Sequence, residues 1–345
     1  MSVFSKIKDF MNRHQRKFLI GGIFIAGSVF AVRYVENFMR EWQKKEAIEF
    51  IERARKQNHF EAINNTCGET TLNISASLLD KMYETVNTEN LILTLKSNPK
   101  NKVELWNQLK NQVFIQAACI IYSLVILVVL LKLQLNIVGS YLYKDPTSIP
   151  FDMQESYLSL SQHFINVGVK KLANTIENKV SSITENVELG KKMKLSDLET
   201  IFWSLQGSLD SDEEGPVCNL KSFIFERDVP TSDDLLSSML KDTVDLLESE
   251  EVKYVVVHLT NRGFMLLSDQ LSEFFDQSEP KIKELPRAAT QFNNPLMNKK
   301  PLAKLIPILN GLLSRTSLPQ NLLQDLRTNE KLQTLCANVY ESLLV

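Results

Sequence analysis

The side chains most often used in catalysis and metal binding are scattered along this 345-residue chain. No two of its four histidines have the HxxxH or HExxH spacing that places two imidazoles on one helix face to bind zinc. The sequence also lacks the GxSxG, P-loop and GxGxxG patterns that mark nucleophile elbows and phosphate-binding loops. We therefore predict no enzyme activity, no cofactor and no metal site. The histidines are His14, His59, His163 and His258.

The cysteine spacing argues against a disulfide-rich or zinc-binding protein, and the charge distribution argues against a nucleic-acid-binding protein. Cys67, Cys119, Cys218 and Cys336 are widely spaced without a CxxC pair, which predicts ordinary thiols in a reducing compartment. The net charge is -2, and no basic stripe with interleaved aromatic residues is present. Binding to nucleic acid is therefore not expected.

A helix-loop-helix corner at residues 91–110 offers a different chemistry, the binding of an apolar helix. Leu91, Leu93 and Leu95 precede the loop SNPKN, and Val103, Trp106 and Leu109 follow it at helical spacing. Two apolar edges meet there, and such a corner could hold an amphipathic helix. The alternative is that Trp106 is buried in a helical bundle and the lysines are simply solvated. The lysines that frame the corner in sequence are Lys96, Lys100, Lys102 and Lys110.

The corner leads into an apolar run, residues 113–131, that contains 19 residues without a charge. At about 1.5 Å per residue, such a helix approaches the roughly 30 Å hydrocarbon core of a bilayer. Gln116, Tyr122 and Ser123 inside the run are tolerated more easily in the centre of a protein bundle. Periodicity does not separate the two interpretations. We favour a buried central helix over a second membrane span, mainly because of the family resemblance described below.

The remaining sequence predicts an all-α fold. Glycine and proline number only 11 each, and the first proline is Pro99, so long helices are allowed. The alternating pattern of residues 252–259 favours a strand almost as strongly as a helix. An isolated strand would have no partner for its backbone groups, so we predict helix there. Breaks are predicted at 144–150, 207–216 and 278–301. Helices are predicted at 34–62, 75–96, 101–142, 152–187, 195–206, 231–249, 252–275, 300–315 and 318–343.

The N-terminus combines basic and apolar segments. Residues 1–60 hold 12 Lys and Arg against 6 Asp and Glu, a balance of +6, whereas the remainder carries -8. We predict a basic segment at 1–17, a single transmembrane anchor at 18–35 and an all-helical domain at 36–345. The positive charges on the two sides of the anchor nearly balance and give no orientation, and it is the resemblance described below that implies a cytosolic domain. A cleaved secretory signal peptide is the alternative for the first 32 residues.

Five short sequence segments, which occur in the order typical of one protein family and are spread over nearly the whole chain, carry a family resemblance. The chain resembles the peroxin-3 family, proteins of peroxisomal membrane biogenesis. The residues at 181–230 and 276–298 match that family only loosely. The segments are NKVELWNQLK (101–110), LQLNIVGSYLY (133–143), NRGF (261–264), PLAKLIPILNG (301–311) and ANVYE (337–341).

The resemblance implies a function and a topology. Peroxin-3 proteins dock peroxin-19, the soluble chaperone of peroxisomal membrane proteins, in a groove centred on a tryptophan. That groove corresponds here to Trp106 with Leu95, Lys96 and Lys102, and the apolar spacing adds Leu109 as a second wall. The family also implies a lumenal N-terminus in the peroxisomal membrane, with transit through the endoplasmic reticulum left open. A tether or adaptor for autophagy or inheritance factors is the alternative role.

The same resemblance assigns a role to the basic N-terminal cluster RHQRK. In the family such a cluster is part of the peroxisomal targeting signal, and it would contact the membrane lipid beside the anchor. The residues concerned are Arg13, His14, Arg16 and Lys17. The alternative is a solvated run of charge that only orients the helix.

Overall fold

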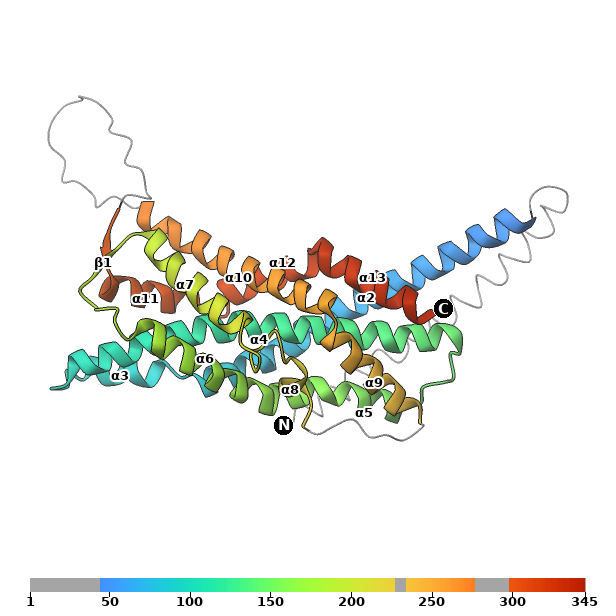
Figure 1. Cartoon of the computed structure of the whole chain (residues 1–345), viewed down its shortest axis with the longest axis horizontal. Coiled ribbons are helices and arrows are strands. Elements are labelled where there is room, and N and C mark those ends of the chain that lie inside the picture. Colours follow the sequence, from blue (N-terminus) through green and yellow to red (C-terminus); the bar gives the residue numbers. More distant parts are fainter. Residues whose placement is uncertain (1–43, 227–233, 277–297, 345) are drawn as a thin grey trace, which may run out of the picture.

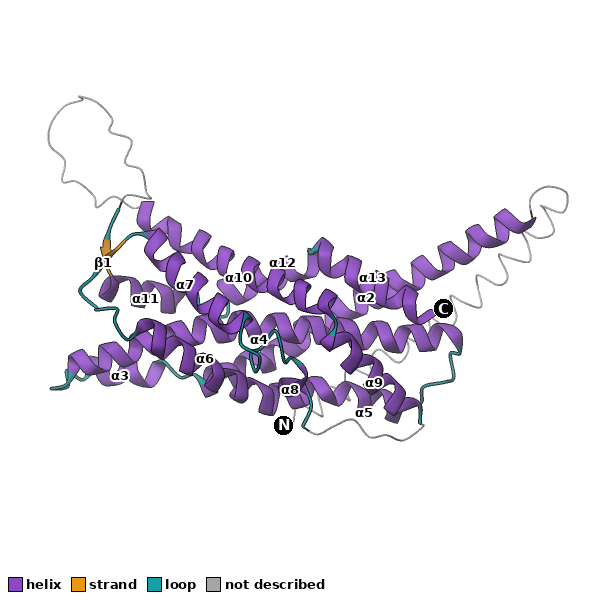
Figure 2. Cartoon of the chain, viewed as in Figure 1, coloured by secondary structure: helices purple, strands orange, loops and turns teal. Residues whose placement is uncertain are grey.

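The computed structural model describes residues 44–226, 234–276 and 298–344, and these residues form an all-α body (Figures 1 and 2). The predicted basic segment 1–17 and the predicted anchor 18–35 lie outside the described residues. The helices are α2 (Lys44–Thr85), α3 (Glu89–Lys96), α4 (Lys102–Lys144), α5 (Phe151–His163), α6 (Val169–Thr184), α7 (Leu195–Asp210), α8 (Lys221–Ile224), α9 (Leu235–Glu248), α10 (Glu250–Asp276), α11 (Leu302–Leu312), α12 (Leu318–Thr328) and α13 (Glu330–Leu344).

Helix α4 is the centre of this body. It crosses the length of the molecule in Figure 1, and every residue from Val113 to Ser140 is buried. Among the described helices, it alone is long and apolar enough to cross a membrane, and its most apolar 18-residue window is entirely covered by protein. The predicted buried central helix is therefore confirmed. The helices that contact α4 are α2, α3, α5, α6, α9, α10, α11, α12 and α13.

Two glycines let neighbouring helices approach the buried helix α4 closely. A Cβ on Gly263 of α10 would lie 2.6 Å from Ile121 Cγ2, and one on Gly139 of α4 would lie 2.1 Å from Ile63 Cδ1 of α2. Such separations are far below van der Waals contact, so a side chain at Gly263 would clash with the branched Ile121, and one at Gly139 would displace the end of the Ile63 side chain. Both glycines lie within the segments that carry the family resemblance.

Several polar side chains within α4 have partners, although the buried Ser123 hydroxyl has none among the described residues. Gln116 donates to the Val86 carbonyl at 3.1 Å, and Lys132 donates to Asn64 Oδ1 at 2.7 Å. Gln134 donates to the Tyr157 carbonyl at 2.7 Å. These bonds offset the cost of burying the polar groups that make them.

Helix α2 is longer than predicted. The predicted break between residues 62 and 75 is wrong, because α2 continues for 42 residues to Thr85. Local turn signals in NNTCGETTLN are overridden by packing, since Cys67, Thr70 and Thr71 are buried against the body. Thr70 also bonds to the Thr66 carbonyl one turn earlier at 2.8 Å, which satisfies its hydroxyl within the helix.

The other differences from the sequence prediction are local. The predicted helix 152–187 contains a π turn, η1 (Phe164–Gly168), between α5 and α6. The predicted helix 318–343 is interrupted at Asn329, between α12 and α13. Residues 252–259 are helical as predicted, and the strands β1 (Lys192–Met193) and β2 (Lys300–Pro301) form a short antiparallel pair. The predicted loop 278–301 lies mostly outside the described residues.

Candidate functional site: the α3–α4 corner

The loop between α3 and α4 is built by local hydrogen bonds. The amide of Ser97 donates to the Thr94 carbonyl at 3.2 Å, and that of Asn98 donates to the Leu95 carbonyl at 3.3 Å. Asn98 has a φ of 60°, a left-handed conformation that asparagine tolerates better than most residues. This turn ends α3, and α4 begins at Lys102. The chain therefore reverses within five residues, as the sequence predicted.

Apolar side chains line the corner in a gradient from solvent to core. Leu93 on α3 is 62% exposed, and Val103 on α4 is 71% exposed. Leu95 and Trp106 are half-buried and pack against the hydrophobic core. Val103 lies one helical turn before Trp106, so this exposed aliphatic side chain and the half-buried tryptophan form an apolar edge that a partner helix could cover. Lys96 and Lys102 are exposed at its edge.

Two residues assigned to the corner from sequence lie elsewhere. Leu109 is only 3% exposed and belongs to the core beneath the corner, so its side chain does not form an open wall. The apolar stripe that faces inward is formed by Leu105, Leu109 and Val113, rather than by the Val103, Trp106 and Leu109 series that the sequence indicated. The helix is rotated so that Val103 points to solvent and Trp106 lies at the boundary.

Lys110 does not frame the corner, because its side chain is buried, with 3% exposure. Its ammonium donates to the carbonyls of Thr184 and Val187 at 2.8 and 2.9 Å, at the end of α6. Burial lowers the pKa of Lys110, while the carbonyls supply the negative ends of dipoles at the helix C-terminus. The neighbouring Asn111 accepts a bond from the Thr184 hydroxyl at 2.9 Å. These contacts fix the start of α4 against α6.

Replacing Lys110 with Met is expected to destabilise the fold by about 1–3 kcal/mol, because two carbonyls lose their buried donor. Chemical denaturation of the purified protein measures this change. Lys96→Met is the matched control, and since Lys96 is exposed, its effect should stay within about 0.5 kcal/mol. Equal stability of the two variants would show that the bonds of Lys110 contribute nothing.

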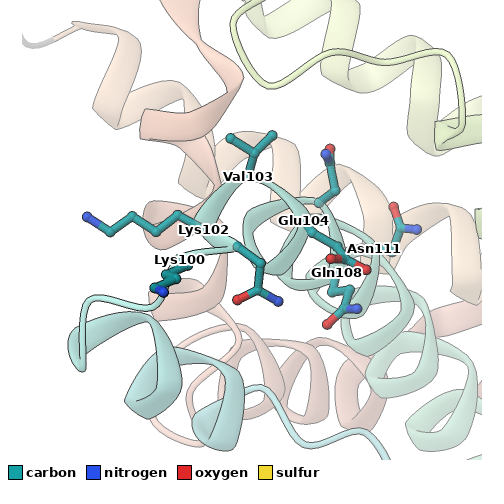
Figure 3. Close-up of a pocket in the computed structure, with 8 residues that line it drawn as sticks. Lys100, Lys102, Val103, Glu104, Gln108 and Asn111 are labelled. Atoms are coloured by element: carbon teal, nitrogen blue, oxygen red, sulfur yellow. The ribbon is translucent and has the colours of Figure 1, made fainter.

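An open hollow of about 720 Å³, lined mostly by long polar residues, lies along the first turns of α4. Figure 3 shows Lys100 and Lys102 at one end of this hollow, with Glu104, Gln108 and Asn111 following along the helix. The hollow adjoins Val103, so the exposed apolar edge and the polar face are continuous. An amphipathic partner helix could therefore bury its apolar face at the corner and hydrogen-bond along its edge.

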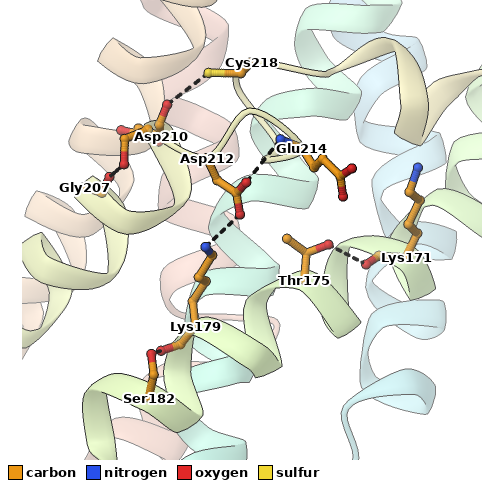
Figure 4. Close-up of polar contacts among 10 residues, drawn as sticks. Lys171, Thr175, Lys179, Ser182, Gly207, Asp210, Asp212, Glu214 and Cys218 are labelled. Atoms are coloured by element: carbon orange, nitrogen blue, oxygen red, sulfur yellow. Dashed lines mark hydrogen bonds and ion pairs between the residues drawn. The ribbon is translucent and has the colours of Figure 1, made fainter.

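Charged groups away from the corner form structural ties. Figure 4 shows Lys179 of α6 paired with Asp212 at 2.7 Å, and the bond from Lys179 lowers the pKa of Asp212. Asp210 accepts a bond from the buried Tyr122 hydroxyl at 2.7 Å, and burial raises the pKa of both groups. These contacts attach the end of α7 to α4 and α6. Within the described ranges, no group of three or more His, Cys, Asp or Glu side chains is placed to hold a metal ion.

Comparison with known proteins identifies relatives along nearly the whole chain. The sequence matches the family model of Peroxin-3 over residues 96–145 and 142–342. It is 32% identical to "Peroxisomal biogenesis factor 3" of Homo sapiens over 367 residues, covering 97% of this chain and 96% of the human protein. The Mus musculus protein of the same name is 33% identical over 97% of this chain and 96% of its own length. "Peroxisome biogenesis protein 3-1" of Arabidopsis thaliana is 21% identical over 57% of this chain and 62% of its own length.

Proposed function

From the premise that the chain belongs to the peroxin-3 family and acts in peroxisome biogenesis, we propose that it is the membrane-anchored docking receptor for peroxin-19. In this role it captures the chaperone with its cargo at the peroxisome and promotes insertion of membrane proteins. The reaction is a sequence of binding steps, and no covalent chemistry is involved. The relatives are named as biogenesis factors.

The observation that supports this proposal most strongly is the apolar gradient at the α3–α4 corner. A partner helix that covers Val103 would reach the half-buried ring of Trp106, one turn further along α4. Aromatic residues at such boundaries often carry most of the binding energy of an interface. Lys96 and Lys102 would form a basic rim, which favours a partner with acidic flanks.

Recovery of partners from cytosol tests this function. The full-length chain in detergent micelles, immobilised on beads, is expected to retain peroxin-19. Retention of autophagy or inheritance factors without peroxin-19 would replace the receptor role by that of a tether or adaptor. Substrate turnover by the purified protein would contradict the proposed mechanism.

The proposed topology places residues 1–17 in the peroxisomal lumen, the anchor at 18–35 and the helical body in the cytosol. Residues 1 to about 45 should therefore carry a fluorescent reporter to peroxisomes, because they contain the basic cluster and an apolar segment of adequate length. Neutralising Arg13, Arg16 and Lys17 together should misdirect the reporter. Delivery is scored by co-localisation with a peroxisomal marker. If the neutralised reporter reached peroxisomes as efficiently as the unmodified one, the basic cluster would be only a solvated charged segment without a targeting role.

A further inference from the structure

The outer face of α7 and α10 carries two large apolar side chains in solvent. Trp203 of α7 is 66% exposed, and Met265 of α10 is 53% exposed. Each directly follows a buried phenylalanine, Phe202 or Phe264, whose rings are 5.8 Å apart. An exposed tryptophan is unusual, and both tryptophan and the adaptable methionine side chain are favoured in binding surfaces.

The arrangement of the two helices brings these side chains to the same side. Strand β1, just before α7, pairs with β2, and Lys300 of β2 donates to the Phe274 carbonyl near the end of α10. The start of α7 therefore lies beside the end of α10, and the helices are antiparallel neighbours (Figure 1). One residue advances about 100° around a helix. Phe202 and Phe264 face each other across the two helices. Because the helices run in opposite directions, the residue after each phenylalanine points to the same side of the pair, so Trp203 and Met265 lie on one outer face.

The charged residues of α7 and of the adjoining part of α10 are acidic. Residues 195–210 of α7 and 263–276 of α10 contain no Lys, Arg or His. Asp269 and Glu273 are exposed on α10, and Glu199 is half-exposed on α7. Basic residues flank these ranges. Arg262, one turn before Met265, is paired with Asp325 at 3.0 Å, and Lys192, Lys194 and Lys300 lie near the opposite end. A partner with clustered lysines or arginines would therefore be attracted to this face, whereas an anionic bilayer surface would be repelled.

We propose that the face formed by Trp203, Met265, Glu199, Asp269 and Glu273 is a second docking surface, which binds a cationic amphipathic helix of a partner protein. The bulky apolar side chains of that helix pack on Trp203 and Met265. Its lysines or arginines pair with the surrounding carboxylates. This surface is separate from the α3–α4 corner, and its assignment does not depend on the docking of peroxin-19.

The test uses a synthetic helical peptide, LKKLLKLLKKLLKL, and a matched peptide in which Glu replaces every Lys. Calorimetry with the full-length protein in neutral detergent is expected to show saturable binding of the lysine peptide only. Trp203→Ser should weaken that binding at least tenfold, and Asp269→Lys combined with Glu273→Lys should weaken it by a similar factor. Because these side chains are exposed, thermal unfolding of the variants should be unchanged, which separates loss of binding from loss of fold.

Val103→Ser is the control that separates the two surfaces, since Val103 belongs to the corner and is similarly exposed. It should leave binding of the lysine peptide unchanged. The proposal is overturned if Val103→Ser removes binding, if Trp203→Ser does not weaken it, or if the glutamate peptide binds equally well. It is also overturned if the wild-type protein self-associates in sedimentation experiments and Trp203→Ser is monomeric, because the face would then hold a second copy.

Discussion

Replacing Leu127 with Asp is expected to unfold the entire helical body. Leu127 lies near the middle of α4 and is fully buried among apolar side chains. An unpaired carboxylate there must either lose its hydration or take up a proton, and either change costs several kcal/mol. Total stabilities of globular domains are only about 5–15 kcal/mol. Because the helices around α4 share this one core, their structure should be lost together.

Circular dichroism during chemical denaturation measures this loss. Leu127→Ala is the graded control and should remain folded with a loss of about 2–5 kcal/mol, the usual effect of a cavity. Leu93→Asp is the exposed control and should unfold like the wild type. A different result would contradict this account. If Leu127→Asp kept its cooperative unfolding transition and merely needed more detergent to stay in solution, α4 would be a membrane span and not the core of the body.

Replacing Trp106 with Ala is expected to weaken peroxin-19 binding by about 2–4 kcal/mol, which corresponds to a roughly 30- to 700-fold rise in Kd. The loss is large because Trp106 is the one aromatic ring at the boundary between the exposed edge of the corner and the core. Its half-burial also contributes to folding, so a stability loss of about 1–2 kcal/mol is expected. Calorimetry and thermal unfolding of the same protein separate these two effects.

Two further variants make the Trp106 result specific to the corner. Trp203→Ala removes a tryptophan from a different face and should leave peroxin-19 affinity unchanged. Lys102→Ala removes a charge from the rim and should cost less than Trp106→Ala, partly through slower association. A large drop in the unfolding temperature of Trp106→Ala, with affinity retained in the folded fraction, would place Trp106 in the core and the binding site elsewhere.

The central helix was predictable in extent because its signal is long and uniform, whereas the choice between a core helix and a membrane span depended mainly on the family resemblance. A charge-free run that also carries Gln116 and Ser123 suits a protein core better than lipid, and the structure buries it completely. The length of α2 was not predictable in the same way. Its Asn, Gly and Thr residues around Cys67 favour a turn locally, and only the packing of α2 against α4 keeps them helical.

The candidate site was predictable in position but not in detail. The spacing of Leu93, Val103 and Trp106 located the corner, but it did not set the rotation of α4, which depends on the helices packed around it. Lys110 is the clearest case. A lysine in a polar sequence reads as a surface residue, and its burial depends on carbonyls at the end of α6, more than seventy positions along the chain. Trp203 likewise gave no local signal of exposure.

Site-specific crosslinking from position 103 tests the central claim most directly. A photoreactive benzophenone amino acid in place of Val103, in the full-length protein in membranes, reports which protein lies against the α3–α4 corner. We predict a covalent adduct with peroxin-19 when the chaperone is added, and none from the same amino acid at position 203. A peroxin-19 adduct from position 203 with none from position 103 would contradict docking at this corner.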